Sequence, residues 1–376
     1  MTGKHRSKGD RMNRRDFLKV SGIGALAMAS SPSVGVAGGK VPEFAKNAER
    51  LGPVIKNAVL KSNPELSGKK ASFFIDDAIW FLRDLTRSRP KSLFDNSFLA
   101  PLKECHDRYG LKLQINLFYR TDFYYGMDEF TLKEVSGDYK SEWQANRDWL
   151  RLGFHSLQEF PDYPWLNASY ADVKKLFEMT YDEVLRFAGE GVFTDALVPH
   201  WCPMSKDGCR ALKDKGIRIM ECSVGERYRY DGDRGRLPYG HGMRIEQNRK
   251  PESAFFFRDT RNAAISASAC GYNHISPEHD RATKNSFKYV YDPETGMAFK
   301  HLFCDAPCLN LVNEKLLRED TEKLLGREYL VFSDHEQYFY RDYLAYQSDY
   351  ADKIRLMSKM MKENGYDFIF IEDVVA

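Results

Sequence analysis

The sequence lacks several features that would assign the protein to a well-defined class. No run of apolar residues is long enough to cross a bilayer, so no stable membrane span is expected in the mature chain. No Cys-x-x-Cys pair occurs among the seven cysteines, which disfavours a zinc ribbon or a thioredoxin-like site. No internal repeat or low-complexity linker divides the chain. Its 376 residues, 43% of them hydrophobic, can form one large core.

The excess of basic residues is confined to the first 37 positions. The formal net charge is +2, but residues 1–37 hold seven Lys and Arg against two Asp and Glu. The remaining chain has 49 basic and 52 acidic residues, a net charge of −3. Because phosphate binding needs a concentrated basic face, this mildly acidic remainder argues against nucleic acid as a partner.

The first 37 residues resemble a bacterial twin-arginine export signal. Asn13–Lys19 contains paired arginines, Val20–Ala29 is weakly hydrophobic, and small residues end at Gly35–Ala37. The alternative is an amphipathic basic helix on a membrane surface. We therefore expect an exported protein, periplasmic or extracellular, with residues 38–376 as the folded part.

Short apolar runs alternate with longer helical patterns after residue 70, which is typical of repeated β-α units. Apolar positions spaced near 3.6 residues predict a helix over 170–188, and Gly189 would end it. Residues 224–300 break this rhythm and are expected to be an insertion of loops and hairpins. The fold expected is an α/β (β/α) barrel in a single domain. The predicted strands are 71–77, 111–119, 152–156, 196–201, 217–222, 329–333 and 368–371.

Polar clusters end four of these predicted strands. They are Asp76-Asp77, His155, His200 and His335-Glu336. Because the carboxyl ends of parallel barrel strands meet on one face, we expect these side chains to form one site.

Asp76 and Asp77 place two like charges side by side, which requires a cation, a proton or strong donors. One carboxylate could bind a metal ion while the other takes a proton from water. The alternative is that the pair caps a helix starting at Ile79.

The histidines supply further candidate ligands. If the chain turns helically after its strand, His155 and Glu159 lie four residues apart and could bind one ion. His200 could be a further ligand, a substrate contact or a buried hydrogen-bonded residue. Asp334 and Glu336 flank His335 and are expected to raise its pKa, as a general acid requires.

These motifs, taken in order, resemble the polysaccharide deacetylase superfamily, whose NodB-homology fold is a distorted (β/α)7 barrel. Asp76-Asp77 matches its first motif, which carries the catalytic base and then a metal ligand. His155–Glu159 is similar to its second motif, and His335 to the general acid of its last. Glu159 stands where that family has a second ligand histidine, so the third ligand would be Glu159 or His200. Near Pro199 the arginine that usually contacts the base is absent.

The resemblance implies a divalent metal ion, with Zn²⁺ as the first candidate, and a carbohydrate substrate. Asp77, His155 and Glu159 or His200 would bind the metal, Asp76 would be the base and His335 the acid. Side chains near the same face are candidates for substrate binding, namely Tyr119, Arg120, Tyr163, Trp165 and Trp201.

Two other functions are open from the sequence. A glycoside hydrolase could use a carboxylate pair such as Asp76 and Glu336 and would need no metal. A barrel that binds carbohydrate without catalysis would explain Glu159 and the missing arginine.

Overall fold

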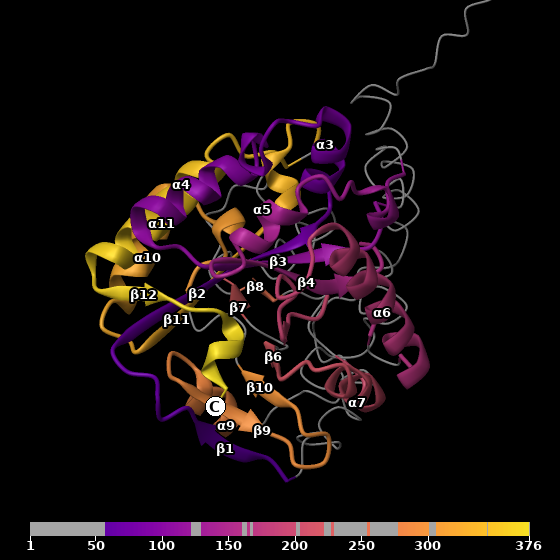
Figure 1. Ribbon diagram of the computed structural model, residues 1–376. Coiled ribbons are helices and arrows are strands. Elements are labelled where there is room, and N and C mark those ends of the chain that lie inside the picture. The colour runs from indigo at the N-terminus through magenta and orange to yellow at the C-terminus, as the bar shows by residue number, and fades with distance from the viewer. Residues whose placement is uncertain are drawn as a thin grey trace, which may run out of the picture. The chain divides into compact units, whose positions relative to one another are not determined.

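Strands and helices alternate along the described part of the chain (Figure 1). The computed structural model describes residues 57–121, 129–159, 164–165, 168–200, 204–221, 227–228, 254–255, 277–300, 306–343 and 345–375. All of them belong to a compact unit that spans Phe44–Ala376. The strands are β1 (Val59–Ser62), β2 (Lys69–Ala78), β3 (Leu113–Phe118), β4 (Leu150–Ser156), β5 (Ala196–Leu197), β6 (Ile219–Glu221), β7 (Arg227–Tyr228), β8 (Ala254–Phe255), β9 (Lys288–Tyr291), β10 (Ala298–Lys300), β11 (Tyr329–His335) and β12 (Tyr366–Phe368). The α-helices are α3 (Trp80–Ser88), α4 (Leu99–Tyr109), α5 (Lys140–Ala145), α6 (Tyr170–Phe187), α7 (Lys206–Asp214), α9 (Pro277–Thr283), α10 (Glu314–Leu324) and α11 (Tyr350–Glu363).

Most strand pairs are parallel, as repeated β-α units require. One sheet has the order β11-β2-β3-β4, with β12 paired to the start of β2, and every pair in it is parallel. The other has the order β1-β9-β10-β6-β5, in which β10, β6 and β5 are parallel and β9 is antiparallel to both its neighbours. A single parallel bridge, Leu152 to Phe193, connects the sheets at β4. Next to β11 the described residues contribute only the bridge Cys308 to Ser333, so an α/β fold is confirmed but a closed barrel is not.

Both sheets contribute side chains to one apolar cluster, which we call the inner core. Most of its fully buried members come from β2, β5, β6, β10 and β11, and Ile371 and Val374 come from the chain end that follows β12. They include Phe74, Ala196, Ile219, Ala298 and Val331. Because side chains at i and i+2 share a face of a strand, the residues two positions further on extend toward the carboxyl ends on this same side. That is how the sheets position Asp76, Val198, Glu221, Lys300 and Ser333.

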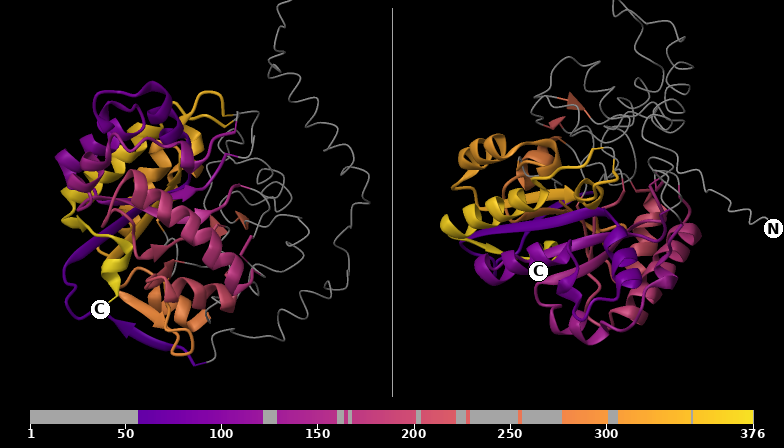
Figure 2. Two further views of the ribbon diagram at one scale, coloured as in Figure 1. Left: turned by 45° about the vertical axis from the view of Figure 1, so that its right-hand side comes forward. Right: turned by 90° about the horizontal axis from the view of Figure 1, so that it is seen from above.

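Helices pack on the opposite faces of these strands, in two groups. Figures 1 and 2 show α4, α10 and α11 along one flank and α6 and α7 along another. The first group packs on β2, β3 and β11 in a large apolar cluster, and the second packs on β4, β6 and β10 in a smaller one. The inner face is thereby left to the inner core and to the polar residues above it.

Helix α6 illustrates how local sequence sets an element's limits. The Ser169 hydroxyl accepts a hydrogen bond from the backbone N–H of Asp172, which satisfies one of the donors left free at a helix start. Val173, Phe177 and Val184 form the buried stripe. Gly189 follows the helix with φ of +91°, a conformation that favours glycine, and this confirms the predicted stop.

Helix α3 is capped by a residue distant in sequence. Its N-cap position, Ile79, has no capping side chain. Glu336 instead accepts hydrogen bonds from the backbone N–H groups of Ile79, Trp80 and Phe81 at 2.6, 2.9 and 2.6 Å. The helix dipole favours a carboxylate at this position. The idea that Asp76 and Asp77 cap this helix is therefore wrong, because Glu336 makes those bonds.

Two expectations about element limits are also wrong. Residues 288–300, expected to belong to an insertion, supply β9 and β10, and β10 pairs in parallel with β6. The last strand is Tyr366–Phe368 rather than 368–371, and Ile371–Val374 is a short 3-10 helix. Apolar runs of three or four residues do not distinguish these forms without the neighbouring strand.

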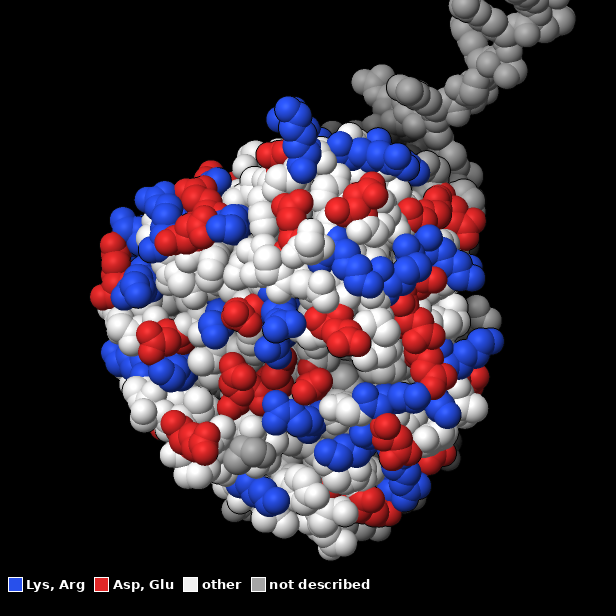
Figure 3. Space-filling view, viewed as in Figure 1, with Lys and Arg blue, Asp and Glu red and all other residues white. Residues whose placement is uncertain are grey.

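Charges of both signs are mixed on the face shown in Figure 3, and neither forms a continuous field there. Among the described residues, none of the helices has both the length and the apolar character that a membrane crossing would require.

We predict that Glu336→Leu destabilises the fold by about 2–4 kcal/mol, because three buried N–H groups lose a charged acceptor. Glu336→Gln keeps one acceptor oxygen and should lose less. Urea unfolding followed by circular dichroism measures both. Equal midpoints for the wild type and Glu336→Leu would contradict the capping role.

Candidate metal centre

A bulge near the end of β2 lets two consecutive aspartates face the same site. Along the β2-β3 ladder Ile75 pairs with Ile115 but Ala78 pairs with Leu117, so β2 contains one extra residue. Asp77 lies in this irregular stretch with φ of +58°, an uncommon left-handed conformation that Asp tolerates better than most residues. In a regular strand neighbouring side chains point to opposite faces. The bulge therefore brings the carboxylates of Asp76 and Asp77 to one region.

A second bulge re-aims His155 in β4. Leu117 pairs with Phe154, whereas the next residue of β3, Phe118, pairs with Ser156. His155 is the residue left over, and its ring is 2% exposed. The aromatic ring of Phe118 lies against His155 and also against His200, with centroids 5.5 and 5.0 Å apart. Phe118 thus forms one apolar wall beside both imidazoles.

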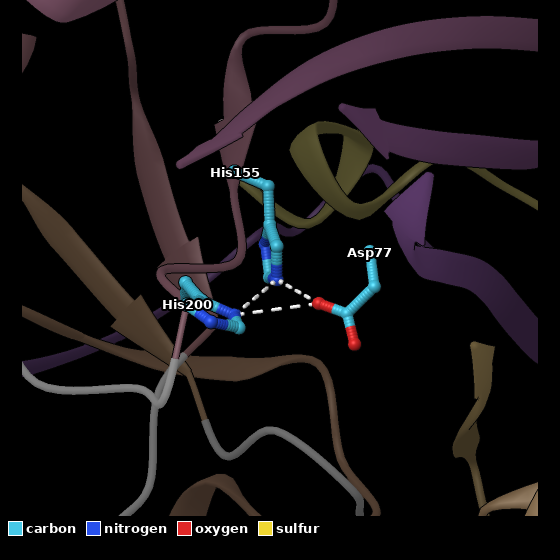
Figure 4. Close-up of side chains that lie close together, drawn as sticks. All are labelled: Asp77, His155 and His200. Atoms are coloured by element: carbon cyan, nitrogen blue, oxygen red, sulfur yellow. Dashed lines mark hydrogen bonds and ion pairs between the residues drawn. The ribbon is translucent and has the colours of Figure 1, made fainter. Parts of the chain in front are cut away.

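Asp77, His155 and His200 converge from three separate segments, as Figure 4 shows. Asp77 Oδ1 lies 3.1 Å from His155 Nε2 and 3.3 Å from His200 Nδ1. The two ring nitrogens lie 3.0 Å from each other. All three residues are buried, and within the described part of the chain they form the one group of ligand types close enough to share a metal ion.

Backbone carbonyls fix which nitrogen of each ring carries a hydrogen. His155 Nδ1 lies 2.8 Å from the carbonyl oxygen of Val198, and His200 Nε2 lies 2.9 Å from that of Glu159. A carbonyl oxygen only accepts, so both of these nitrogens must be N–H donors. In neutral rings the other nitrogens therefore carry lone pairs, and these are the two that face each other beside Asp77. Two lone pairs and a carboxylate oxygen at this separation require a positive charge between them.

In the absence of a metal ion a proton can supply that charge. Burial opposes a charge on His200, but its hydrogen bond to Asp77 and that residue's charge raise the pKa of His200 to about 9. Burial lowers the pKa of His155 to about 4. Burial also opposes ionisation of Asp77, yet its close contacts with the two imidazoles hold the pKa of Asp77 well below its usual value. These three groups therefore fit a divalent cation, which would replace one proton.

Asp76 lies beside this group without belonging to it. Its Oδ1 accepts a hydrogen bond of 2.6 Å from the Asn116 side chain and lies 3.8 Å from His155 Nδ1. Burial and the neighbouring charge of Asp77 raise the pKa of Asp76 well above its usual value. A carboxylate with raised proton affinity beside a cation site is suited to accept a proton from water.

His335 approaches from the opposite side of Asp77. It is the last residue of β11 and is in register with Asp76 on β2. Its Nε2 lies 4.0 Å from Asp77 Oδ2, while its Nδ1 lies 2.9 Å from Asn310 Oδ1. The Cys308 thiol donates to the same Asn310 oxygen, so this atom is an acceptor and His335 Nδ1 carries the hydrogen. Nε2 is then the atom presented to the site.

The expectation that Asp334 and Glu336 raise the pKa of His335 is wrong. Burial lowers the pKa of His335, and Asp77 opposes this shift. Asp334 accepts a hydrogen bond from the backbone N–H of His335, and burial raises its own pKa to about 7. Glu336 is occupied by the start of α3. Neither carboxylate therefore acts on the ring as adjacency in sequence implied.

The other predicted site residues lie around this centre. Glu159 contributes its backbone carbonyl to His200, and its side chain is outside the group that could hold one metal ion. Arg120 is half-buried, with Nε 2.5 Å from Gln158 Oε1. Trp165 is 2% exposed and donates from its indole N–H to the backbone oxygen of His155 at 3.0 Å. Its position supports the metal ligand and presents little ring surface to a substrate. Tyr163 and Trp201 lie outside the described residues.

Sequence reasoning missed Gln337, which donates a 2.9 Å hydrogen bond to Asp77 Oδ2 and so holds the oxygen that does not face the histidines. It also missed Glu221, a fully buried carboxylate at the end of β6, in register with the buried Lys300 of β10. Glu221 ends a predicted strand just as Asp76 does, so the same positional signal was available for it.

We predict that the protein binds one divalent cation per chain and that His200→Ala weakens this binding more than about 100-fold. Loss of a direct ligand should exceed the roughly 10–100-fold cost of losing an outer partner. Glu159→Gln is the matched control and should stay within about tenfold. Calorimetric titration with Zn²⁺ measures both, and the reverse ranking would exclude His200 as the third ligand.

We also predict that Zn²⁺ affinity rises about tenfold per pH unit between about pH 6 and pH 8 and levels off near pH 9. Below its pKa of about 9, His200 is protonated, so the cation must displace a proton. Titrations in buffers of different ionisation enthalpy should count about one released proton at neutral pH. An affinity independent of pH would contradict the assignment.

Comparisons with known proteins found distant similarity to solved structures. No protein-family model and no curated protein matches the sequence. A 4-alpha-glucanotransferase from Thermococcus litoralis is 14% identical with a TM-score of 0.45, and the alignment covers 82% of this chain but only 40% of that one. A protein described as a polysaccharide deacetylase from Mycobacterium smegmatis is 10% identical with a TM-score of 0.40, over 85% of this chain and 93% of that one. A CE4 family pseudoenzyme from Bacillus anthracis is 10% identical with a TM-score of 0.35, over 84% and 67% respectively. A protein described as a deacetylase is thus among the solved structures that this chain resembles.

Proposed function

We propose that the chain is an exported, metal-dependent hydrolase that removes acetyl groups from a saccharide. One observation carries the proposal: two histidine lone pairs and the Asp77 carboxylate converge beside a second buried carboxylate, Asp76. A cation site next to a general base is the arrangement needed for metal-assisted hydrolysis. Export is proposed on the twin-arginine-like segment alone.

Asp77, His155 and His200 would hold the cation, each through one atom. A divalent ion at that position would polarise a carbonyl oxygen of the substrate and favour the ionised form of Asp76. The other polar atom of each of these three side chains already has a hydrogen-bond partner: His155 and His200 donate to backbone carbonyls, and Asp77 Oδ2 accepts from Gln337. Little reorganisation of these side chains would be needed on binding.

Asp76 is the group placed to take the proton from an attacking water. Its carboxylate is held by Asn116 on the inner side of the strand ends, within 3.8 Å of the His155 ring. Its raised proton affinity suits it to accept a proton from water. It would hold that proton while the acyl group is attacked.

His335, when both of its ring nitrogens carry hydrogen, is the group placed to give a proton to the departing amine or alcohol; burial lowers its pKa, and the charge of Asp77 favours this protonated form. The Asn310 side chain fixes its Nδ1–H, so only Nε2 can exchange a proton with a molecule in the site. This nitrogen lies on the Asp77 Oδ2 side, away from the two ligand histidines. Base and acid therefore come from two neighbouring strands, β2 and β11.

A saccharide is proposed as the substrate because the order of the strand-end motifs resembles the polysaccharide deacetylases. Arg120, at the end of the β3 segment, is the described candidate for gripping its hydroxyl groups. The proposal concerns acetyl esters or acetamides of a sugar, since both present the carbonyl that this site would attack.

A glycoside hydrolase using Asp76 and Glu336 is disfavoured by the structure. Both Glu336 oxygens accept backbone hydrogen bonds at the start of α3, and Tyr340 donates a further bond of 3.0 Å to Oε1. A carboxylate occupied in this way is not available to protonate or attack a glycosidic bond.

We predict that the zinc-loaded full-length protein releases acetate from one or more members of a panel of acetylated oligosaccharides. Chelation should abolish release and Zn²⁺ should restore it, and Asp76→Asn should lower kcat about 10²–10⁴-fold with the metal retained. Cleavage of glycosidic bonds in the presence of chelator would instead indicate the glycoside hydrolase. Saccharide binding without turnover, equal in the wild type and Asp76→Asn, would indicate a non-catalytic binding protein.

A further inference from the structure

The Asp76 carboxylate is held by a neutral amide. Asn116 Nδ2 donates to Asp76 Oδ1 at 2.6 Å, and both side chains are buried, Asn116 completely. Asn116 lies on β3, the strand next to β2, and points to the same inner side. The side chain that holds the Asp76 carboxylate therefore carries no charge.

A second amide fixes the orientation of the first. Gln114 Nε2 donates to Asn116 Oδ1 at 2.7 Å, so the NH2 group of Asn116 has to face Asp76. Gln114 Oε1 in turn lies 3.4 Å from the Thr194 hydroxyl, which is also 2.8 Å from Glu372 Oε2. This chain of polar groups crosses the inner side of the sheets from the Glu372 end to the strand ends. Each member restricts the rotation of the next.

Gly153 on β4 leaves room for these amides. A Cβ atom added at Gly153 would lie 2.6 Å from Asn116 Oδ1, 2.9 Å from Thr194 Cγ2 and 3.4 Å from Gln114 Nε2. The first two separations are shorter than van der Waals contact, and the neighbours are fully buried. Glycine is therefore required here by the close passage of the amide chain, independently of any hydrogen bond to Asp76.

From this arrangement we propose that Asn116 is the positioning residue of the proposed reaction: oriented by Gln114 and given space by Gly153, it holds the Asp76 carboxylate toward the cation position. Asn116 itself would not touch the substrate. Its amide would contact the carboxylate of the base, as the arginine absent beside Pro199 would be expected to do. Unlike arginine, it adds no charge to the buried site. This inference rests on the proposed function where it is tested by kinetics, whereas the orientation of Asp76 can be tested without any assumption about the reaction.

The test uses Asn116→Leu in the full-length, zinc-loaded protein. Leucine keeps the branched shape of the asparagine side chain but removes both the donor to Asp76 and the acceptor for Gln114, so we expect kcat for acetate release to fall about 10–100-fold, as losses of orienting partners do. KM and bound zinc should stay within about twofold of the wild type, because the three ligand atoms do not contact Asn116. Ser72→Ala is the matched control. Ser72 lies on the same strand as Asp76, and its hydroxyl makes hydrogen bonds with the backbone of Ile369 and with Tyr329, which the substitution removes. It should leave kcat within about twofold.

A crystal structure of Asn116→Leu separates this inference from the proposed function. We expect the Asp76 carboxylate to rotate, so that Oδ1 no longer lies 3.8 Å from His155 Nδ1. If the wild type hydrolyses no acetylated saccharide, the proposed function fails, and the orientation of Asp76 in this structure still decides the positioning role. An unmoved Asp76, or a kcat within twofold of the wild type in a folded, zinc-containing variant, would overturn it.

Gly153→Ala gives a second readout through the same amide. The added methyl group should displace Asn116 and lower kcat about tenfold, and the further loss should be much smaller in the Asn116→Leu background because both changes act through one contact. If the two substitutions instead lower kcat by factors that multiply in the double variant, Gly153 affects the site by another route, and this result would count against the proposal.

Discussion

The orientation of two imidazole rings is the constraint on which this site depends. Each ring donates one N–H to a backbone carbonyl, His155 to Val198 and His200 to Glu159, so the remaining nitrogens face each other 3.0 Å apart next to Asp77. Without a positive charge between them, two lone pairs and a carboxylate would repel one another in a buried environment. A shared proton or a bound cation satisfies all three, and this need explains why three residues from separate segments are held so closely.

Irregular strand geometry makes the convergence possible. Bulges in β2 and β4 each insert one residue, and those stretches contain Asp77 and His155. A regular sheet would direct Asp76 and Asp77 to opposite faces and would separate the roles of base and ligand. The left-handed backbone at Asp77 has an energetic cost, and the hydrogen bond that Gln337 donates to the Asp77 carboxylate helps to offset it.

The sequence predicted the location of the site better than its connections. Polar residues at the ends of apolar strands indicated that Asp76, Asp77, His155, His200 and His335 would lie together, because parallel strands share one carboxyl edge. Helix limits such as Gly189 were predictable from local signals. Glu159 was assigned as a ligand from its spacing of four residues from His155, and Glu336 was assigned an effect on His335 from adjacency, yet Glu159 contributes its backbone carbonyl and Glu336 caps α3. Those partners lie far away in sequence, which no local pattern reveals.

Polar residues within the strands carried a signal that was present but unused. Gln114 and Asn116 alternate with apolar residues in a strand buried on both faces, where polar side chains must find partners. That pattern indicated a polar inner side, although it could not show that Asn116 reaches Asp76. The role of Gly153 could not be assigned either, because it depends on the side chains of Gln114 and Asn116 on β3 and of Thr194.

A bound cation at the meeting point of Asp77, His155 and His200 is the central claim, and anomalous X-ray diffraction from zinc-loaded crystals tests it most directly. The account predicts one strong peak about 2.0–2.2 Å from Asp77 Oδ1, His155 Nε2 and His200 Nδ1. A fully occupied zinc ion bound elsewhere, with these three side chains unchanged and still within hydrogen-bonding distance of one another, would contradict it.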